Sequence, residues 1–326
     1  MNPQQAPSCR RVAIAGMLAM LTIAGFSWER AQARVAPYHP QAIHHAADKR
    51  VVHGLKYHPP YSAIVIDHNS GQVFHNENAD EPRRPASLTK IMTLYLLFEQ
   101  LEAGRLKLDT QLGVSVFAAL QPPTKLGLKA NQTLAVEDAI KGLVTESAND
   151  AAVVVAEAIA GSEAEFAKLM TQKARALGMM STTYINASGL PADEQITTAR
   201  DQALLGCAIQ DHFPDYYRYF STLSFRYHGV EMHNHNALLG QLEGVDGVKT
   251  GYTEASGYNL VASVHRKEKH IVAVVLGGTP RAKRDARMRE LLTRYIPLAV
   301  TERTQIYVRK PRFEQEVQPR DAIGNL

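Results

Sequence analysis

Residues 87–101 read SLTKIMTLYLLFEQL, a run that is apolar on nearly every side once it is wound as a helix. A helix of that kind is buried all round, so we expect a buried helix over residues 88–101. Pro85 breaks the chain before it, and Gly104 ends it. Lys90 is the exception in this run, because it places an ammonium group in apolar surroundings.

Ser87 and Lys90 lie three residues apart at the start of the helix, so their side chains share one face. A hydroxyl needs a base to become a nucleophile. An unpaired buried ammonium is costly, so the pKa of Lys90 is expected to fall and its neutral amine can act as that base. The helix start also favours negative charge near Ser87. Ser-x-x-Lys alone is a common pattern, and the prediction of an activated serine therefore depends on its context.

The elements around this helix predict an α+β fold. Residues 61–67 and 72–75 read as a hairpin about the turn Asn69-Ser70-Gly71. Three further strands are expected over residues 245–251, 259–265 and 271–276. Helices are expected over residues 136–144, 151–160, 162–177, 198–210 and 283–296. Strands, then helices, then strands and a last helix are typical of an antiparallel sheet packed with helices, plus a mostly helical subdomain.

The N-terminus reads as a signal peptide over residues 1–33. Arg10 and Arg11 precede an apolar stretch, and Ala31-Gln32-Ala33 has the small-x-small form of a cleavage site. We expect cleavage near Ala33 and a periplasmic or secreted mature protein.

Three segments follow the signal peptide. Residues 34–57 are rich in His and Pro and are expected to form a linker or arm. Residues 58–296 form the predicted catalytic domain, and residues 297–326 a short C-terminal tail with a strand over residues 305–308.

Composition excludes several classes of partner. The formal net charge is +4 and no long basic run is present, so nucleic acid is not expected.

Cys207 lies in an apolar helical pattern and is predicted to be a small buried core residue. His228, His233 and His235 cluster without a metal-binding motif. We therefore expect a surface histidine cluster, no metal and no cofactor.

Two more short motifs occur once each. Ser147-Ala148-Asn149 falls in the predicted connection between two helices, and Lys249-Thr250-Gly251 ends a predicted strand. Together with Ser87 and Lys90 they form the trio known from β-lactamases and penicillin-binding proteins.

With these motifs the chain resembles the penicillin-binding D-alanyl-D-alanine carboxypeptidases, which are low-molecular-mass serine peptidases of bacterial cell walls. The resemblance covers about residues 58–296. It extends to the segments Tyr184–Pro191, Thr198–Asp201, His233–Leu239 and Gly244–Thr253. It implies the β-lactamase/transpeptidase-like fold and a reaction by acyl-enzyme on a peptidoglycan stem peptide, without a cofactor.

The resemblance also implies roles for the reacting groups. Ser87 attacks the carbonyl between two D-alanines, and Lys90 takes its proton. Ser147 relays a proton to the leaving amine. Backbone N–H groups of Ser87 and Tyr252 form the oxyanion hole.

The remaining residues are expected to bind substrate. Asn149 holds the peptide, Thr250 bonds its carboxylate, and Gly251 permits close approach of the strand. Lys249 supplies positive charge that keeps Lys90 neutral and attracts the carboxylate. Arg284, in a looser local match, also holds that carboxylate.

Several readings stay open on sequence alone. Larger family members carry a second domain and an anchoring helix, whereas about thirty residues follow residue 296 here, so we expect no stable membrane anchor. The alternatives to a carboxypeptidase are a DD-endopeptidase that cuts cross-links, a serine β-lactamase and a non-catalytic wall-binding module. No Glu-x-x-Leu-Asn segment is present, so β-lactam antibiotics are expected to be covalent inhibitors.

Overall fold

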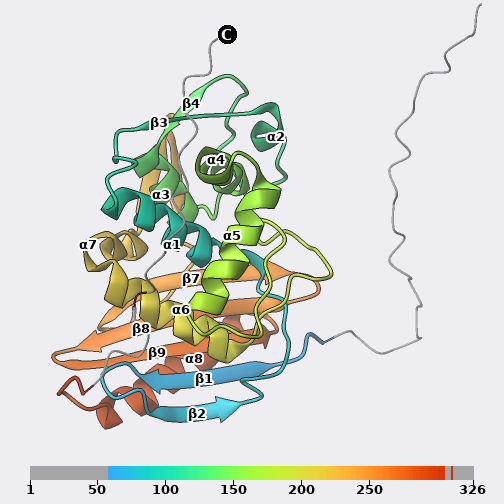
Figure 1. Ribbon diagram of the computed structural model, residues 1–326. Helices are drawn as coiled ribbons and strands as arrows, with labels where there is room; N and C mark the ends of the chain where they lie inside the picture. Colours follow the sequence, from blue (N-terminus) through green and yellow to red (C-terminus); the bar gives the residue numbers. More distant parts are fainter. Residues whose placement is uncertain (1–57, 305–309, 311–326) are drawn as a thin grey trace, which may run out of the picture. The chain divides into compact units, whose positions relative to one another are not determined.

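The computed structural model describes residues 58–304 and residue 310. Its framework is a five-stranded antiparallel sheet with the strand order β2-β1-β9-β8-β7 (Figure 1). The strands are β1 (Ser62–Asp67), β2 (Val73–Glu77), β7 (Val245–Thr253), β8 (Gly257–Arg266) and β9 (Lys269–Gly278). The predicted hairpin and the three later strands are therefore confirmed, and each of the later three is longer than expected.

Alternation along the strands divides the apolar side chains between two cores. On β1, Ile64 and Ile66 face one core, whereas Ala63 and Val65 face the other. The second core is closed by Met288, Leu291 and Leu292 of α8 (Arg281–Tyr295). Because successive side chains of a strand point to opposite faces, a sheet buried on both sides needs apolar residues at every position.

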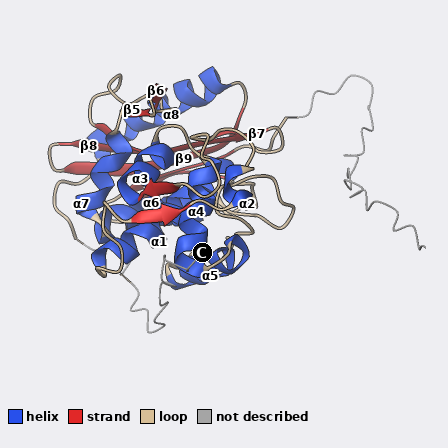
Figure 2. Cartoon of the chain, turned by 90° about the horizontal axis from the view of Figure 1, so that it is seen from above, coloured by secondary structure: helices blue, strands red, loops and turns tan. Residues whose placement is uncertain are grey.

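The larger core lies between the sheet and the remaining helices. It is built around α1 (Thr89–Glu102), the helix expected over residues 88–101, and around α4 (Asn149–Ala160). α4 packs against α1, α2, α3 and α5, which form the helical subdomain that Figure 2 shows from above. The other helices are α2 (Val116–Ala119), α3 (Val136–Val144), α5 (Glu163–Ala176), α6 (Ala199–His212) and α7 (Pro214–Tyr217). Three short 3₁₀ helices are η1 (Ala86–Leu88), η2 (Arg218–Ser221) and η3 (Ile296–Leu298).

Helix starts follow local chemistry. Ser162 and Thr198, which begin two predicted helices, are their N-caps, and each side chain accepts from the backbone N–H three residues on. α4 differs from expectation because it begins at Asn149, so the predicted connection over residues 145–150 ends two residues early. Asp150 in its first turn suits the positive end of the helix dipole.

Two small sheets were not predicted. β3 (Gln111–Gly113) pairs with β4 (Thr133–Ala135), and β5 (Ser224–Tyr227) pairs with β6 (Val230–His233). The signal peptide, the arm and the strand expected over residues 305–308 lie outside the described residues. Within the described part of the chain, no helix is long and apolar enough to cross a membrane.

Candidate active site

Ser87 lies in η1, directly ahead of α1, on a turn fixed from several sides. The Asn259 side chain donates to the backbone oxygens of Arg84, at 3.0 Å, and Pro85, at 3.1 Å. Ala86 has a φ of +50°, an uncommon conformation for a residue with a side chain. The surrounding contacts therefore hold the serine in a strained, well-determined turn.

Lys90 is fully buried beneath this turn. Its Nζ lies 3.1 Å from Ser87 Oγ, 2.7 Å from Asn149 Oδ1 and 2.5 Å from the Ser188 oxygen. Burial, and then the positive charge of Lys249, lower the pKa of Lys90 well below its usual value. The direction agrees with the expected fall in pKa, but the amine is hydrogen-bonded rather than unpaired. A neutral amine at this distance can accept the Ser87 proton.

Ser147 and Asn149 meet this pair from the helical subdomain. Ser147 has a φ of +63°, and its buried Oγ makes no hydrogen bond to any described residue. The amide of Asn149 bridges Lys90 and the Pro122 oxygen, to which its Nδ2 donates at 2.9 Å. Asn149 therefore positions the lysine, a contact that the sequence did not reveal. Whether its amide also touches a peptide stays a prediction.

Asp150 is a positioning residue that sequence reasoning missed. Its carboxylate accepts from the backbone N–H groups of Leu126, Gly127 and Leu128 at 3.0, 2.9 and 3.0 Å. These bonds fix the loop that continues from Pro123 and Thr124, two residues that line the site.

A turn at residues 186–189 completes the support of Ser87. Asn186 Oδ1 accepts from the Gly189 N–H at 2.7 Å and so shapes the turn. Gly189 has a φ of +88°, and a Cβ there would lie 1.9 Å from the Ala86 oxygen. Glycine is therefore required at this position, and the turn presents the Ser188 oxygen to Lys90.

Edge strand β7 forms the opposite wall. A Cβ at Gly251 would lie 3.0 Å from the Pro85 oxygen and 3.0 Å from the Ser87 nitrogen, so a larger residue would crowd the serine turn. Tyr252, next along, is 51% exposed and stacks on Tyr258. The strand thus approaches the serine turn closely. Its expected close approach to the substrate stays a prediction.

Lys249 is buried behind this wall, with Nζ donating to the Thr250 oxygen at 2.9 Å. Burial, followed by the charge of Arg284, lowers the pKa of Lys249 to about 7. Because the charge of Lys249 in turn lowers the pKa of Lys90, simultaneous protonation of the two amines is unfavourable.

Basic side chains gather at one end of the site. Arg284 is 2% exposed, donates to the Asn259 oxygen at 2.7 Å and pairs with Asp285. Burial lowers its pKa to about 10. His235 also lines the site, and its pKa falls to about 4 because of burial and the nearby Lys249. His235 is half-buried and borders the cleft, so it is less exposed than a surface cluster predicts.

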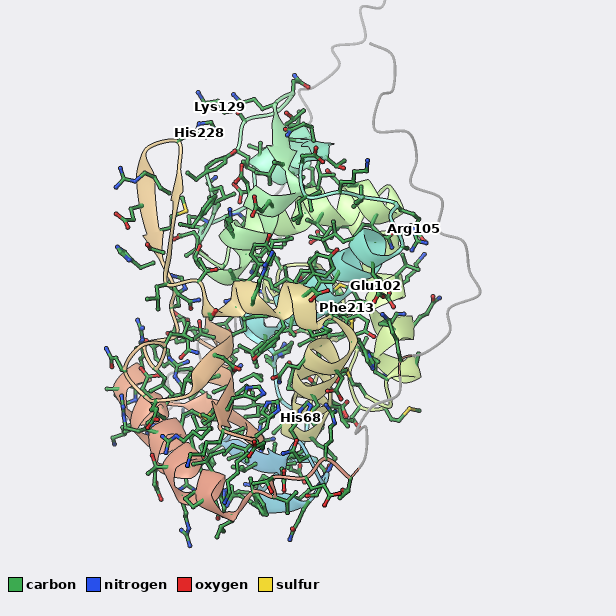
Figure 3. The ribbon with its side chains drawn as sticks, turned by 90° about the vertical axis from the view of Figure 1, so that its left-hand side faces the viewer. His68, Glu102, Arg105, Lys129, Phe213 and His228 are labelled. Carbon is green, nitrogen blue, oxygen red and sulfur yellow. The ribbon has the colours of Figure 1, made fainter. Side chains whose placement is uncertain are left out.

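The three clustered histidines separate in the structure. His228 occupies the tip of the β5–β6 hairpin, which projects from the body of the domain in Figure 3. Within residues 58–304 no group of three or more His, Cys, Asp or Glu side chains is arranged to hold a metal ion. Cys207 is buried, as predicted.

These elements enclose a cleft of about 350 Å³. Of the predicted site residues, it is lined directly by Ser87, Ser147, Asn149, Thr250, Gly251, Tyr252 and Arg284. Lys90 and Lys249 lie buried at its floor and wall. The lining residues that were not predicted as site residues are Pro123, Thr124, Gly189, Leu190, His235, Thr253, Tyr258 and Arg281. The structure thus brings all nine predicted residues together.

A buried lysine beside a serine, in a cleft between an edge strand and a helical subdomain, is the arrangement that acyl transfer by an activated serine requires. Comparison with known proteins gives the family. The model of the S11 peptidases, described as D-alanyl-D-alanine carboxypeptidase, matches residues 54–280. The chain belongs to this family.

Individual relatives agree with that assignment. The D-alanyl-D-alanine carboxypeptidase DacA of Escherichia coli K12 is 38% identical over 260 residues, which are 76% of this chain and 64% of DacA. This chain therefore spans less than two thirds of the length of that relative. The D-alanyl-D-alanine endopeptidase of the same strain is 28% identical over 225 residues, which are 66% of this chain and 70% of that protein.

A solved structure confirms the fold. Penicillin-binding protein D2 from Listeria monocytogenes, in its ampicillin-bound form, superposes with a TM-score of 0.63 and 31% sequence identity. The match covers 71% of this chain and 95% of that one. This match confirms the predicted α+β fold, which is the fold of the penicillin-binding proteins.

Proposed function

We propose that this protein is a serine-type D-alanyl-D-alanine carboxypeptidase that removes the terminal D-alanine from peptidoglycan stem pentapeptides. The observation that carries the proposal is the position of Lys90, whose buried Nζ lies 3.1 Å from Ser87 Oγ at the floor of the cleft. A low-pKa amine beside a hydroxyl suits base-assisted acyl transfer. Membership of the S11 family supports the D-alanyl bond as the target.

Acylation begins when Ser87 Oγ attacks the carbonyl carbon of the bond between the two D-alanines. Lys90 Nζ takes the hydroxyl proton, and the backbone N–H groups of Ser87 and Tyr252 stabilise the oxyanion. The close approach of Gly251 to the Ser87 nitrogen supports this pairing of donors. When the C–N bond breaks, the proton passes through Ser147 Oγ to the leaving amine. Water then hydrolyses the ester, which releases the shortened peptide and restores the serine.

Substrate binding uses the basic end of the cleft. Lys249, Thr250 and Arg284 attract and bond the terminal carboxylate. β7 is an edge strand, so its free side can pair with an extended peptide that places its scissile carbonyl beside Ser87.

β-Lactams are proposed to acylate the same serine. The ampicillin-bound form of the Listeria protein supports this. Slow hydrolysis of that ester makes these antibiotics inhibitors rather than substrates.

The proposal also includes the domain bounds and the export of the protein. Residues 58–296 constitute the catalytic domain, and residues 1–33 direct export to the periplasm, where peptidoglycan is accessible. The export assignment rests on the sequence pattern alone.

The test is digestion of defined muropeptides by the purified chain. Mass spectrometry is expected to show loss of one D-alanine from a pentapeptide. Ser87→Ala is expected to abolish this loss, whereas Ser221→Ala, at an exposed serine outside the cleft lining, is expected to retain it.

Two outcomes contradict the proposal. Cleavage of a cross-linked dimer without any cleavage of the pentapeptide assigns the endopeptidase activity instead. No cleavage of either substrate, together with no labelling by fluorescent penicillin, supports a non-catalytic wall-binding module.

A further inference from the structure

A second cavity, with a volume of about 190 Å³, has no part in the proposed mechanism. We call it the Arg84 pocket, and its walls include Arg84, Asp193 and Ser256. It combines a guanidinium, a carboxylate and backbone from three separate segments. It lies close to Ser87 in the sequence of its wall segments, so a peptide bound at Ser87 can reach it.

The walls of the Arg84 pocket continue those of the active-site cleft. Arg84 stands three residues before Ser87, and Asp193 three residues after Leu190, which lines the cleft. The turn after β7 supplies the third wall. Three residues of chain span at most about 11 Å, so the two cavities are neighbours, and a peptide that occupies both would follow one groove. Two or three extended residues of a bound peptide cover that distance.

The direction of this groove follows from β7. His235 and Arg281 lie toward the first half of the strand, since the neighbouring Asn236 side chain donates to the Gly247 oxygen at 3.0 Å. Gly251 is level with Ser87, and the turn beyond Thr253 borders the Arg84 pocket. A peptide whose terminal carboxylate lies at the basic end therefore extends its acyl side toward the Arg84 pocket.

Arg84 can bind an anion there. Its guanidinium donates to the Ala192 oxygen at 2.9 Å and to the Asp193 carboxylate at 3.2 Å. Asp193 is 98% exposed, so a substrate carboxylate can replace it at little cost in desolvation. Arg83 is different, because its two terminal nitrogens donate to the backbone oxygens of Pro82 and Tyr61. Arg83 also lines the pocket, but its terminal nitrogens are already bonded to backbone oxygens, whereas Arg84 pairs with an exposed carboxylate that a substrate can displace.

We propose that the Arg84 pocket is a subsite for the acyl side of the peptide. In it, Arg84 selects a carboxylate carried on the second or third residue before the scissile bond. The inference rests on the proposed peptidase function and adds a substrate preference to it.

The test uses two synthetic pentapeptides ending in D-alanyl-D-alanine. They differ only in bearing carboxylates or carboxamides on residues two and three. The wild-type protein is expected to show a kcat/KM about 1.5- to fivefold higher for the carboxylate peptide, the range for a partly exposed ion pair. Arg84→Gln is expected to bring the ratio to about one, and Arg84→Lys to keep part of it. Asp193→Asn is expected to raise it, because a competing carboxylate is removed.

Arg226→Gln is the matched control, since Arg226 also pairs with an acidic neighbour, Glu231, but lines neither cavity. It is expected to leave the ratio as in the wild type. If Arg84→Gln loses the same fraction of kcat/KM toward both peptides, Arg84 has only a structural role and the subsite proposal is overturned. A wild-type ratio of one also overturns it, while cleavage of both peptides leaves the peptidase function standing. If the wild type cuts neither peptide, the proposed function itself fails.

Discussion

The turn that holds Ser87 depends on Gly189, and replacing this glycine by alanine tests that dependence. At φ +88° the new Cβ would lie 1.9 Å from the Ala86 oxygen and 2.8 Å from the Ser87 nitrogen. The left-handed conformation costs about 1–2 kcal/mol with a side chain, and relief of the overlap adds about 1–3 kcal/mol. We expect Gly189→Ala to lower the free energy of unfolding by roughly 2–5 kcal/mol.

Gly178 provides the matched control. Its φ is +85°, and a Cβ there meets nothing within 4 Å. Gly178→Ala therefore carries the backbone strain alone, roughly 1–2 kcal/mol, and leaves the serine turn in place.

Urea unfolding measures the stability difference, and the rate of labelling by fluorescent penicillin measures the state of Ser87. Because a displacement of about 1 Å at a reacting group can cost about a hundredfold in rate, Gly189→Ala is expected to label at least tenfold more slowly than Gly178→Ala. Equal stability and equal labelling of the two variants would refute the reasoning.

Three further predictions concern charges. Lys249→Gln removes a positive charge that lowers the pKa of Lys90, so the acid limb of the penicillin acylation rate is expected to move to higher pH; an unmoved limb contradicts the coupling. Burial and neighbouring cations depress the pKa of His270 in the folded protein. Below about pH 6.5 only the unfolded chain therefore takes up this proton, and the free energy of unfolding decreases as the pH is lowered. In His270→Asn, urea unfolding at pH 4 to 6 is expected to show a slope smaller by up to about 1.4 kcal/mol per pH unit, and an unchanged slope rules the residue out. Asp150→Asn puts an amide NH2 in place of one of the two oxygens that accept from three backbone N–H groups, and is expected to cost about 1–3 kcal/mol in urea unfolding; a loss below 0.5 kcal/mol, on the order of an exposed substitution, contradicts that role.

The sequence predicted the sheet and the main helices because their signals are local. Residues 88–101 are apolar all round, and that helix is buried as expected. The three motifs were also readable, because each is short and contiguous. Their convergence on one cleft was an expectation from resemblance, and the geometry bears it out.

What the sequence did not reveal depends on contacts between distant segments. Lys90 was expected to be unpaired, yet its partners come from residues 59 and 98 positions away. The β5–β6 hairpin was missed although apolar and polar residues alternate in it, because each strand has only four residues and Met232 is the one buried residue of the eight. His235 reaches the cleft through the fold rather than through any local pattern.

The central claim is that Ser87 is the acylated nucleophile and that its reactivity depends on the Lys90 amine. Intact-mass spectrometry with peptide mapping, after brief exposure to benzylpenicillin, tests it most directly. The account predicts one adduct per chain, on the peptide that contains Ser87, and its loss in Lys90→Met. An adduct on another residue, or undiminished acylation of Ser87 in Lys90→Met, would contradict it.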